Sequence, residues 1–332
     1  NNLFLSWLIL SLLLILIMII VGGLTRLTNS GLSITEWELF KGIFPPFTNS
    51  DWQIYFNLYK EIPQFKLMNP LMSLDEFKII FYWEYAHRVL GRIIGLFVLI
   101  PLIFFQFYKK IKFNKLIPSY IVFLLVLLQG TVGWYMVQSG LVNNVTVSHY
   151  RLSLHLTLAI LIISIIFWQI LNFKNDKLKP FFKSSKKNIP YIILIFLIYI
   201  QVILGAFVSG LDAGSIYQTW PLMGNNYFPD DVDKNLNDLL NFENHSVIQF
   251  YHRNFAYLLT LYIIFLTFFT LRMNNRLLYR PLLLLNIILL TQIFLGVFTL
   301  LSNLNINLAS AHQLSSVIFV LSALNLYYSV IK

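Results

Sequence analysis

The residues with the most chemical potential in this chain stand at positions 84–88, which read Glu-Tyr-Ala-His-Arg. Glu84 lies three residues before His87 and four before Arg88, so on a helix all three side chains share one face. A carboxylate, an imidazole and a guanidinium together can move protons, ligate a metal and bind an anion. The same spacing also occurs in ordinary Glu–Arg helix pairs beside a packed histidine, so the motif alone leaves both interpretations open.

The histidine of this motif recurs at matched positions along the chain. His87 and His252 are each followed by arginine at the start of a long apolar stretch, and His155 and His312 open two further apolar stretches. A single histidine there would usually be a packing residue, but four at equivalent places indicate ligands. Paired histidines on facing helices of a bundle hold metals or haem. Zinc and copper prefer three or four ligands, so two histidines per half favour bis-histidine haem.

Two further features fit a porphyrin. A small residue follows each histidine by four positions, which would leave clearance beneath an axial ligand, although small residues also serve close helix packing in membranes. These residues are Gly91, Ala159, Ala256 and Ser316. The arginines that follow two of the histidines, Arg88 and Arg253, could pair with haem propionates at the water boundary.

The two copies of the motif differ in one chemical group. The first reads Glu84-Tyr85-Ala86-His87, and the second has Gln249 in place of the glutamate. Glutamine keeps the shape but cannot ionise, whereas a carboxylate one turn from a haem ligand can relay protons or stabilise developing positive charge. We therefore predict that the first half is reactive and that the second is an electron-transfer or structural site. His149 and His245 have no counterparts, and we expect structural roles for them.

The elements that position these residues are membrane helices. The chain has 332 residues, of which 58% are hydrophobic and 11% charged, and its mean hydropathy is +0.70. Such a composition is typical of a polytopic membrane protein, and a bilayer is crossed by about 20 apolar residues in a helix. No cleavable signal precedes the first apolar stretch, which we expect to remain as a helix. The eight predicted spans are 3–24, 79–108, 116–137, 152–171, 190–209, 247–271, 281–301 and 309–331.

The predicted fold is all-α, with eight transmembrane helices arranged as two four-helix bundles. Besides the histidines, 129–133 (Gln-Gly-Thr-Val-Gly) matches 292–296 (Gln-Ile-Phe-Leu-Gly), and Gly22-Gly23 corresponds to Gly205-Ala206. Because each half has an even number of helices, the repeat is parallel, with its axis along the membrane normal.

We assign residues 1–173 to the first half, 174–189 to a basic cytoplasmic linker and 190–332 to the second half. The roughly fifty-residue connection that ends near residue 78 is long for a loop and rich in aromatic residues, and we expect it to cap the outer face. The loop 211–246 is expected to form a second cap.

Charge fixes the predicted orientation. The net charge is +10, but the basic residues gather in the segments that eight spans place on the side of the termini, so they indicate topology rather than nucleic-acid binding. The positive-inside rule places both termini in the cytoplasm. There is no cysteine, which excludes disulfides and cysteine-based cofactors. The basic residues on the terminal side are Lys109, Lys110, Lys112, Lys115, Lys174, Lys177, Lys179, Lys183, Lys186, Lys187, Arg272, Arg276, Arg280 and Lys332.

Several of these motifs together resemble haem A synthase, in the cysteine-less branch that includes the mitochondrial enzymes. The similarity covers nearly the whole chain in the expected order. The motifs that carry it are Gly22-Gly23-Leu24-Thr25-Arg26-Leu27-Thr28, Ser30-Gly31-Leu32-Ser33, Glu84-Tyr85-Ala86-His87-Arg88, Tyr150-Arg151-Leu152 before His155, and Thr219-Trp220-Pro221-Leu222-Met223-Gly224.

The resemblance implies the oxidation of the C8 methyl of haem O to a formyl group by successive hydroxylations. By motif, His87 and His155 would hold the substrate haem beside Glu84, and His252 and His312 would hold a resident haem b. It further implies a multi-pass protein of the cell (inner) membrane, haem O synthase as the upstream partner and delivery of haem A to assembling cytochrome c oxidase. The electron donor or acceptor is not identified, and a homo-oligomer is compatible with the sequence.

Two other classes of function fit the histidines. A di-haem, cytochrome b-like electron carrier explains the four ligands but gives no reason for the difference between Glu84 and Gln249. A haem carrier or transporter suits a parallel repeat, but the spans show no clearly Gly/Pro-broken pair and no acidic residue well inside the membrane.

Overall fold

The computed structural model describes residues 2–37, 41–108, 111–142, 144–183 and 185–331. Three lysines used for the predicted orientation, Lys109, Lys110 and Lys332, lie outside the described residues, as do positions 38–40 of the first loop and 184 of the predicted linker. The regular secondary structure of the described segments is helical, and their only β feature is an isolated bridge between Met223 and Asn226.

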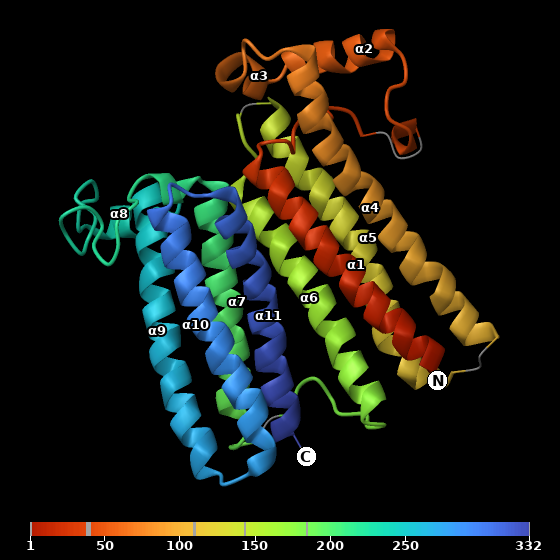
Figure 1. Ribbon diagram of the computed structural model, residues 1–332, viewed down its shortest axis with the longest axis vertical. Coiled ribbons are helices and arrows are strands. Elements are labelled where there is room, and N and C mark those ends of the chain that lie inside the picture. Colours follow the sequence, from red (N-terminus) through yellow and green to blue (C-terminus); the bar gives the residue numbers. More distant parts are fainter. Residues whose placement is uncertain (1, 38–40, 109–110, 143, 184, 332) are drawn as a thin grey trace. The chain divides into compact units, whose positions relative to one another are not determined.

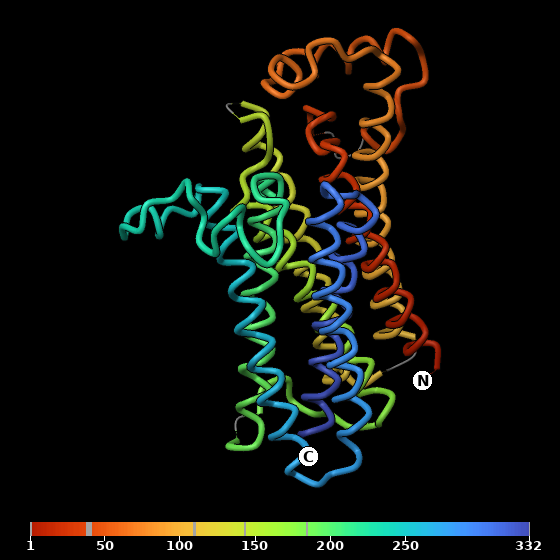
Figure 2. The backbone as a smooth tube through the Cα atoms, turned by 60° about the vertical axis from the view of Figure 1, so that its left-hand side comes forward, coloured from red at the N-terminus to blue at the C-terminus, as the bar shows by residue number. Residues whose placement is uncertain are grey.

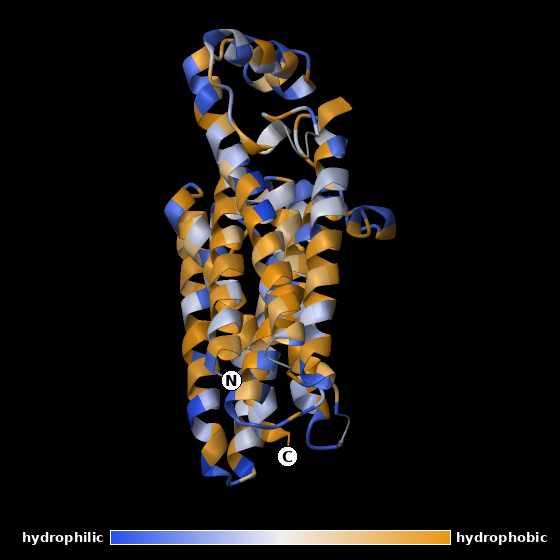
Figure 3. Ribbon diagram, turned by 90° about the vertical axis from the view of Figure 1, so that its right-hand side faces the viewer, coloured by the Kyte–Doolittle hydropathy of each residue, from blue (hydrophilic) through white to orange (hydrophobic). Residues whose placement is uncertain are grey.

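Eight of the described helices are long and apolar enough to cross a membrane, which confirms the predicted number and order of the spans. Apolar residues cover their middle sections and hydrophilic residues gather near their ends (Figure 3). The helices are α1 (Asn2–Leu27), α4 (Leu74–Phe107), α5 (Phe113–Val142), α6 (His149–Lys174), α7 (Ile189–Gly210), α9 (His245–Arg272), α10 (Tyr279–Leu301) and α11 (Ile306–Val330).

Helix α4 begins five residues before the predicted span, at Leu74. Its start is fixed by a capping box, in which the Ser73 side chain accepts from the Glu76 amide and the Glu76 carboxylate accepts from the Ser73 amide. Reciprocal capping of this kind satisfies amides that the first helical turn leaves unpaired. The polar turns at 74–78 therefore extend the helix that carries Glu84 and His87 beyond its apolar part.

The chain divides into two compact units, Asn1–Ile163 and Ser164–Lys332. The boundary between them falls within α6, so that the last part of this helix belongs to the second unit. The assignment of 1–173, 174–189 and 190–332 to two halves and a linker stays a prediction.

In the first unit, α1 packs on α4 and α4 packs on α5. The connection after α1 contains the 3-10 helix η1 (Lys41–Ile43) and the helices α2 (Asn49–Lys60) and α3 (Pro63–Met68), and the latter two lie across the end where α4 begins (Figure 1). A buried apolar cluster joins this connection to the start of α4, so the connection is a folded layer rather than a loose loop. Its members are Leu32, Ile34, Trp52, Phe56, Tyr59, Ile62, Phe77, Phe81 and Val147.

In the second unit, α7 packs on α9, α10 packs on α11, and α11 also contacts α7. The connection after α7 contains η2 (Ala213–Ser215) and α8 (Leu236–Leu239), and it extends from the end where α9 begins (Figure 2). Asp231 ties this connection to α9, because its carboxylate accepts from the Tyr217 hydroxyl and from the Ser246 hydroxyl, both at 2.7 Å. A short 3-10 turn, η3 (Arg276–Leu278), precedes α10.

Candidate functional site: two histidine pairs

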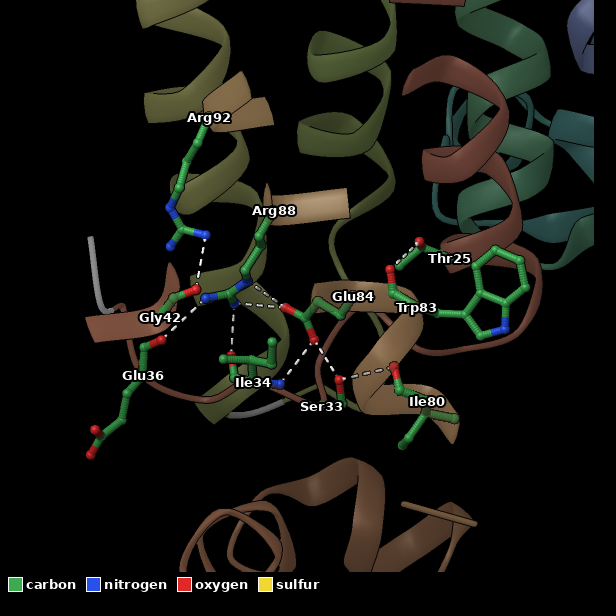
Figure 4. Close-up of polar contacts among 10 residues, drawn as sticks. All are labelled: Thr25, Ser33, Ile34, Glu36, Gly42, Ile80, Trp83, Glu84, Arg88 and Arg92. Atoms are coloured by element: carbon green, nitrogen blue, oxygen red, sulfur yellow. Dashed lines mark hydrogen bonds and ion pairs between the residues drawn. The ribbon is translucent and has the colours of Figure 1, made fainter. Parts of the chain in front are cut away.

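Glu84 is buried in the first unit, with 3% of its side chain exposed, and both of its carboxylate oxygens are engaged. Oε2 accepts from the Ser33 hydroxyl at 2.8 Å and from the Ile34 amide at 2.9 Å. Oε1 accepts from Arg88 Nη2 at 2.6 Å and from Arg88 Nε at 3.0 Å. Four donors thus fix the carboxylate between α4 and the segment that follows α1 (Figure 4).

Arg88 joins the same segment to the helix. Its guanidinium donates to the Ile34 carbonyl at 2.8 Å and to the Glu36 carbonyl at 3.1 Å, and it lies 5.8 Å from the ring of Trp37. Its side chain is 15% exposed. Most of its donors are therefore used within the protein, and its interaction with a haem propionate stays a prediction.

His87 and His155 are brought together by α4 and α6. Their ring centroids are 6.5 Å apart and their planes are inclined by 53°. Two imidazoles bound to one metal ion through ring nitrogens at about 2 Å each have centroids about 6 Å apart. The separation of these two rings therefore fits a single iron between them.

Glycines on neighbouring helices cradle both rings. A Cβ added to Gly22 would lie 3.0 Å from His87 Nε2, and one added to Gly133 would lie 3.0 Å from His155 Cε1. These distances are shorter than ordinary van der Waals contact, so a side chain at either position would displace the ring. The sequence comparison used both glycines as markers of the repeat, but it did not identify them as the surface against which the ligands rest.

The second pair has the same construction. Gly205 of α7 faces His252 of α9, and Gly296 of α10 faces His312 of α11, with Cβ distances to the Cε1 atoms of 3.1 and 3.0 Å. The Nδ1 atom of His312, like that of His155, is buried and has no hydrogen-bond partner within the described part of the chain. A buried donor or acceptor without a partner is costly, and metal-bound histidines routinely give their second ring nitrogen to a neighbouring acceptor. Each histidine of the second pair thus rests against a glycine as in the first, and two imidazoles are the donor set of a bis-histidine haem site.

The place of Glu84 is taken in the second unit by Gln249, which is equally buried at 3% exposed. Its Nε2 donates to the Tyr217 carbonyl at 2.8 Å, and Arg253 donates to the same carbonyl at 2.8 Å. Arg253 also reaches the Thr219 and Leu222 carbonyls, at 2.9 and 3.2 Å. In both units, then, the residue three before the histidine and the arginine after it hold the segment that follows the first helix.

The family model of the cytochrome oxidase assembly proteins matches residues 5–324. The chain belongs to this family.

Relatives in the family support the assignment over the full chain. It is 50% identical over 328 residues to the heme A synthase of Pelagibacter ubique, covering 97% of this chain and 95% of the relative. It is 42% identical over 335 residues to the heme A synthase of Rickettsia felis, covering 100% and 99%. It is also 42% identical over 328 residues to the heme A synthase of Rickettsia bellii, covering 98% and 97%.

The remaining two histidines of this family member lie outside the pairs. His149 is buried at the start of α6 with its ring centroid 4.0 Å from that of Tyr150, and His245 is exposed at the start of α9. Both positions suit the structural roles predicted for them. The described residues contain no group of three or more His, Asp or Glu that could hold a metal ion, so the metal-site candidates in this part of the chain are the two pairs.

Three glutamines contact the histidines, and their function was not anticipated from the sequence. Gln129 Nε2 donates to the His155 carbonyl at 3.0 Å, and Gln292 Nε2 donates to the His312 carbonyl at 3.3 Å. In the remaining contact, Gln201 Nε2 donates to the His252 carbonyl at 3.1 Å and lies 3.2 Å from His252 Nδ1. The sequence carries a signal for them, because each is followed by a glycine four residues later, in α5, α7 and α10.

Proposed function

We propose that this protein is a haem A synthase, which oxidises the C8 methyl of haem O to a formyl group by successive hydroxylations. The observation that carries the proposal is the placement of a buried carboxylate, Glu84, beside one of two otherwise similar histidine pairs. Membership of the family, and relatives named heme A synthase over the full chain, give the same function.

In this proposal His87 and His155 hold the substrate haem O. Gly22 and Gly133 leave room for the two rings on the helices behind them, and the 6.5 Å between ring centroids suits one iron. Gly91 and Ala159 follow the two histidines by four residues on the same helices, and their small size favours clearance for a porphyrin.

Glu84 is the catalytic residue of the proposal. It lies one helical turn from His87, and the hydrogen bonds from Ser33, Ile34 and Arg88 fix its position. A preorganised, buried carboxylate can accept a proton from the reacting group or stabilise positive charge that develops next to it. Arg88 acts on the reaction by positioning Glu84.

His252 and His312 hold a resident haem b, which supplies one-electron transfer when bound. Beside this pair, Gln249 has the shape of a glutamate and keeps a hydrogen bond to the loop before α9, but it has no ionisable group to exchange a proton. The second site therefore transfers electrons without modifying its haem.

The setting of the enzyme follows from the same assignment. Its eight helices lie in the inner membrane with both termini in the cytoplasm, and the two halves are a parallel repeat. Haem O synthase supplies the substrate, and haem A passes to the assembly of cytochrome c oxidase. Electrons are exchanged with a donor or acceptor that the structure does not hold.

The test is chromatography of haems extracted from membranes in which this protein is co-expressed with haem O synthase, with haem O synthase alone as the control. The proposal predicts a haem A peak that appears only when both proteins are present. If haems B and O alone are found while the protein still carries and transfers electrons, the electron-carrier function replaces it. If haem O crosses the membrane chemically unchanged, the protein is a transporter.

A further inference from the structure

Each histidine of the two pairs faces a glycine on a neighbouring helix. The residue four positions before that glycine is the same in three of the four helices and different in the fourth. It is glutamine in three helices, namely Gln129 before Gly133, Gln201 before Gly205 and Gln292 before Gly296. In α1 the corresponding residue, four positions before Gly22, is Met18. Because four residues make about one helical turn, the side chains at both positions of each motif lie on the same face.

Each of the three glutamines binds the histidine on the facing helix. The side-chain amide donates to the histidine carbonyl in all three, at 3.0 to 3.3 Å. The Oε1 atoms of these glutamines are buried and accept no hydrogen bond from the described residues. Each glutamine therefore binds the backbone of the facing helix at the histidine, and its Oε1 remains without a hydrogen bond from the described residues.

In metal sites, a hydrogen-bond acceptor near a ligating histidine binds the N–H of the ring nitrogen that does not bind the metal. An imidazole that binds iron through Nε2 carries its proton on Nδ1, and this N–H is normally donated to a neighbouring acceptor, which fixes the ring and raises its basicity. His155 and His312 have Nδ1 atoms with no partner among the residues described, and Gln201 touches His252 Nδ1 with its Nε2, which is a donor. None of the three Oε1 atoms accepts from a histidine Nδ1 among the described residues. Because each glutamine side chain lies at the carbonyl of the facing histidine, its Oε1 is an acceptor available to the Nδ1–H of the iron-bound ring.

The orientation of the four rings separates His87 from the others. At Gly133, Gly205 and Gly296 the histidine presents Cε1, with Nδ1 as the next atom. At Gly22 the atom presented is His87 Nε2, with Cδ2 next. A half turn about the Cβ–Cγ bond interconverts the two arrangements, so the ring without a glutamine is the one that lies turned over.

Met18 provides neither a donor nor an acceptor of comparable strength. Its Cε lies 3.4 Å from where a Cβ on Gly91 would be, which is the position one turn beyond His87. A thioether side chain is flexible and fills irregular apolar space, so it can adapt to a turning ring and to a porphyrin that enters or leaves.

We propose that the three glutamines are positioning residues that hold the histidines opposite them in the ligating orientation. Met18 leaves His87 without this support, and His87 is therefore the axial ligand that turns to admit substrate haem and to release product. The assignment of entry and release to His87 rests on the proposed function, in which the first site must exchange its haem and the second must retain it.

The test measures haem release rather than haem A formation. The purified protein is loaded with ferric protoporphyrin IX, and transfer of this haem to an excess of a haem-scavenging protein is followed by absorbance. Two kinetic phases of haem transfer are expected. The phase that disappears in His87→Ala belongs to the first site, and the phase that disappears in His252→Ala belongs to the second. The inference predicts that Met18→Gln slows release from the first site by about tenfold or more, the usual size of such supporting contacts, whereas Met18→Leu releases haem at the wild-type rate.

Two results would overturn the inference. One is wild-type release from Met18→Gln, and the other is equal slowing in Met18→Gln and Met18→Leu, which would make packing the cause.

A second measurement applies to the glutamines and does not depend on catalysis. Gln292→Leu removes the acceptor beside His312, so release from the second site should accelerate about 10- to 100-fold. The reduction potential of that haem should also rise, because its ligand becomes less basic. A release rate and a potential that both stay at their wild-type values would contradict the positioning role. A protein that makes no haem A but shows these shifts would refute the proposed function and leave the role of the glutamines standing.

Discussion

Glu84 and Gln249 occupy equivalent positions in the two units, but they bind the segment after the first helix of their unit through different hydrogen bonds. Each is buried, lies three residues before a haem-ligand candidate and reaches the segment after the first helix of its unit. Glu84 accepts four hydrogen bonds, including two from Arg88, whereas Gln249 donates one to the Tyr217 carbonyl. The comparison shows that a neutral residue serves at this position in the second unit, so folding alone does not require a carboxylate here, in agreement with the catalytic role proposed for Glu84.

The arginines sharpen this contrast. Arg88 is paired with a buried carboxylate, and Arg253 donates only to the backbone carbonyls of Tyr217, Thr219 and Leu222 in the contacts described. Breaking a buried ion pair from one side leaves an uncompensated charge, whereas losing a hydrogen bond to a carbonyl leaves only a neutral group unsatisfied.

The largest effect on stability is therefore expected from Arg88→Met. It should lower the free energy of unfolding by about 3–5 kcal/mol, because the Glu84 carboxylate stays buried without its cation. The matched variant Arg253→Met should lose about 1–3 kcal/mol. Unfolding in mixed detergent micelles measures both, and equal losses would mean that the ion pair is not what distinguishes the units.

The glycines behind the histidines should behave alike in both units. Gly133→Ala and Gly296→Ala each place a methyl group 3.0 Å from a histidine Cε1 atom, and overpacking of this kind costs about 1–3 kcal/mol. Each should also lower the haem content at its own site.

Gly130 is the control for this prediction, since it lies on α5 with Gly133 and a Cβ there would have nothing within 4 Å. Gly130→Ala should leave haem content unchanged and stabilise the helix by up to about 1 kcal/mol. Haem content measured by absorbance and thermal unfolding report the two effects. Normal haem content in Gly133→Ala would show that the ring does not rest on this glycine in the loaded protein.

The smallest effect is expected at Asp231, which secures the loop of the second unit. Burial raises the pKa of this carboxyl, but hydrogen bonds from Ser246 and Tyr217 outweigh it and hold the pKa below its usual range. A carboxyl whose pKa is depressed by folding stabilises the folded state above its unfolded pKa, near 3.9, and loses this contribution as the pH falls through the folded value.

Asp231→Asn should therefore loosen the connection between α7 and α9 at neutral pH without affecting the first unit. Limited proteolysis at pH 7 should cut the variant faster within 211–244, whereas the wild type should become equally sensitive only below about pH 4. The same cutting rate in both proteins at pH 7 would show that the carboxylate does not secure the loop.

The sequence was sufficient for the eight spans, because a run of apolar residues long enough to cross a bilayer leaves few alternatives. It also predicted the four ligand candidates and the Glu84–Gln249 difference, because a repeat shows which positions are equivalent. The start of α4 was missed because the capping box at Ser73 and Glu76 lies outside the apolar run and was not considered.

Side-chain partners were harder to predict than helices. The pairing of Arg88 with a haem propionate stays a prediction, but its hydrogen bonds to the carbonyls of Ile34 and Glu36 were not foreseen. Those carbonyls come from a segment about fifty residues away in sequence, and its path over α4 is set by tertiary packing. The contact between Gln201 and His252 was missed for the same reason, since it depends on the register of two helices rather than on spacing within one.

The central claim is that Glu84 makes the first histidine pair reactive, because that pair is the one that holds the substrate haem. The most direct test is to quantify haem A in extracts of membranes that contain haem O synthase together with the wild type, Glu84→Gln, Gln249→Glu or the doubly exchanged protein. The account predicts that Gln249→Glu forms haem A, whereas both proteins that carry Glu84→Gln bind haem but form none. Haem A production by Glu84→Gln at the wild-type level would contradict the account, because the carboxylate would then be dispensable.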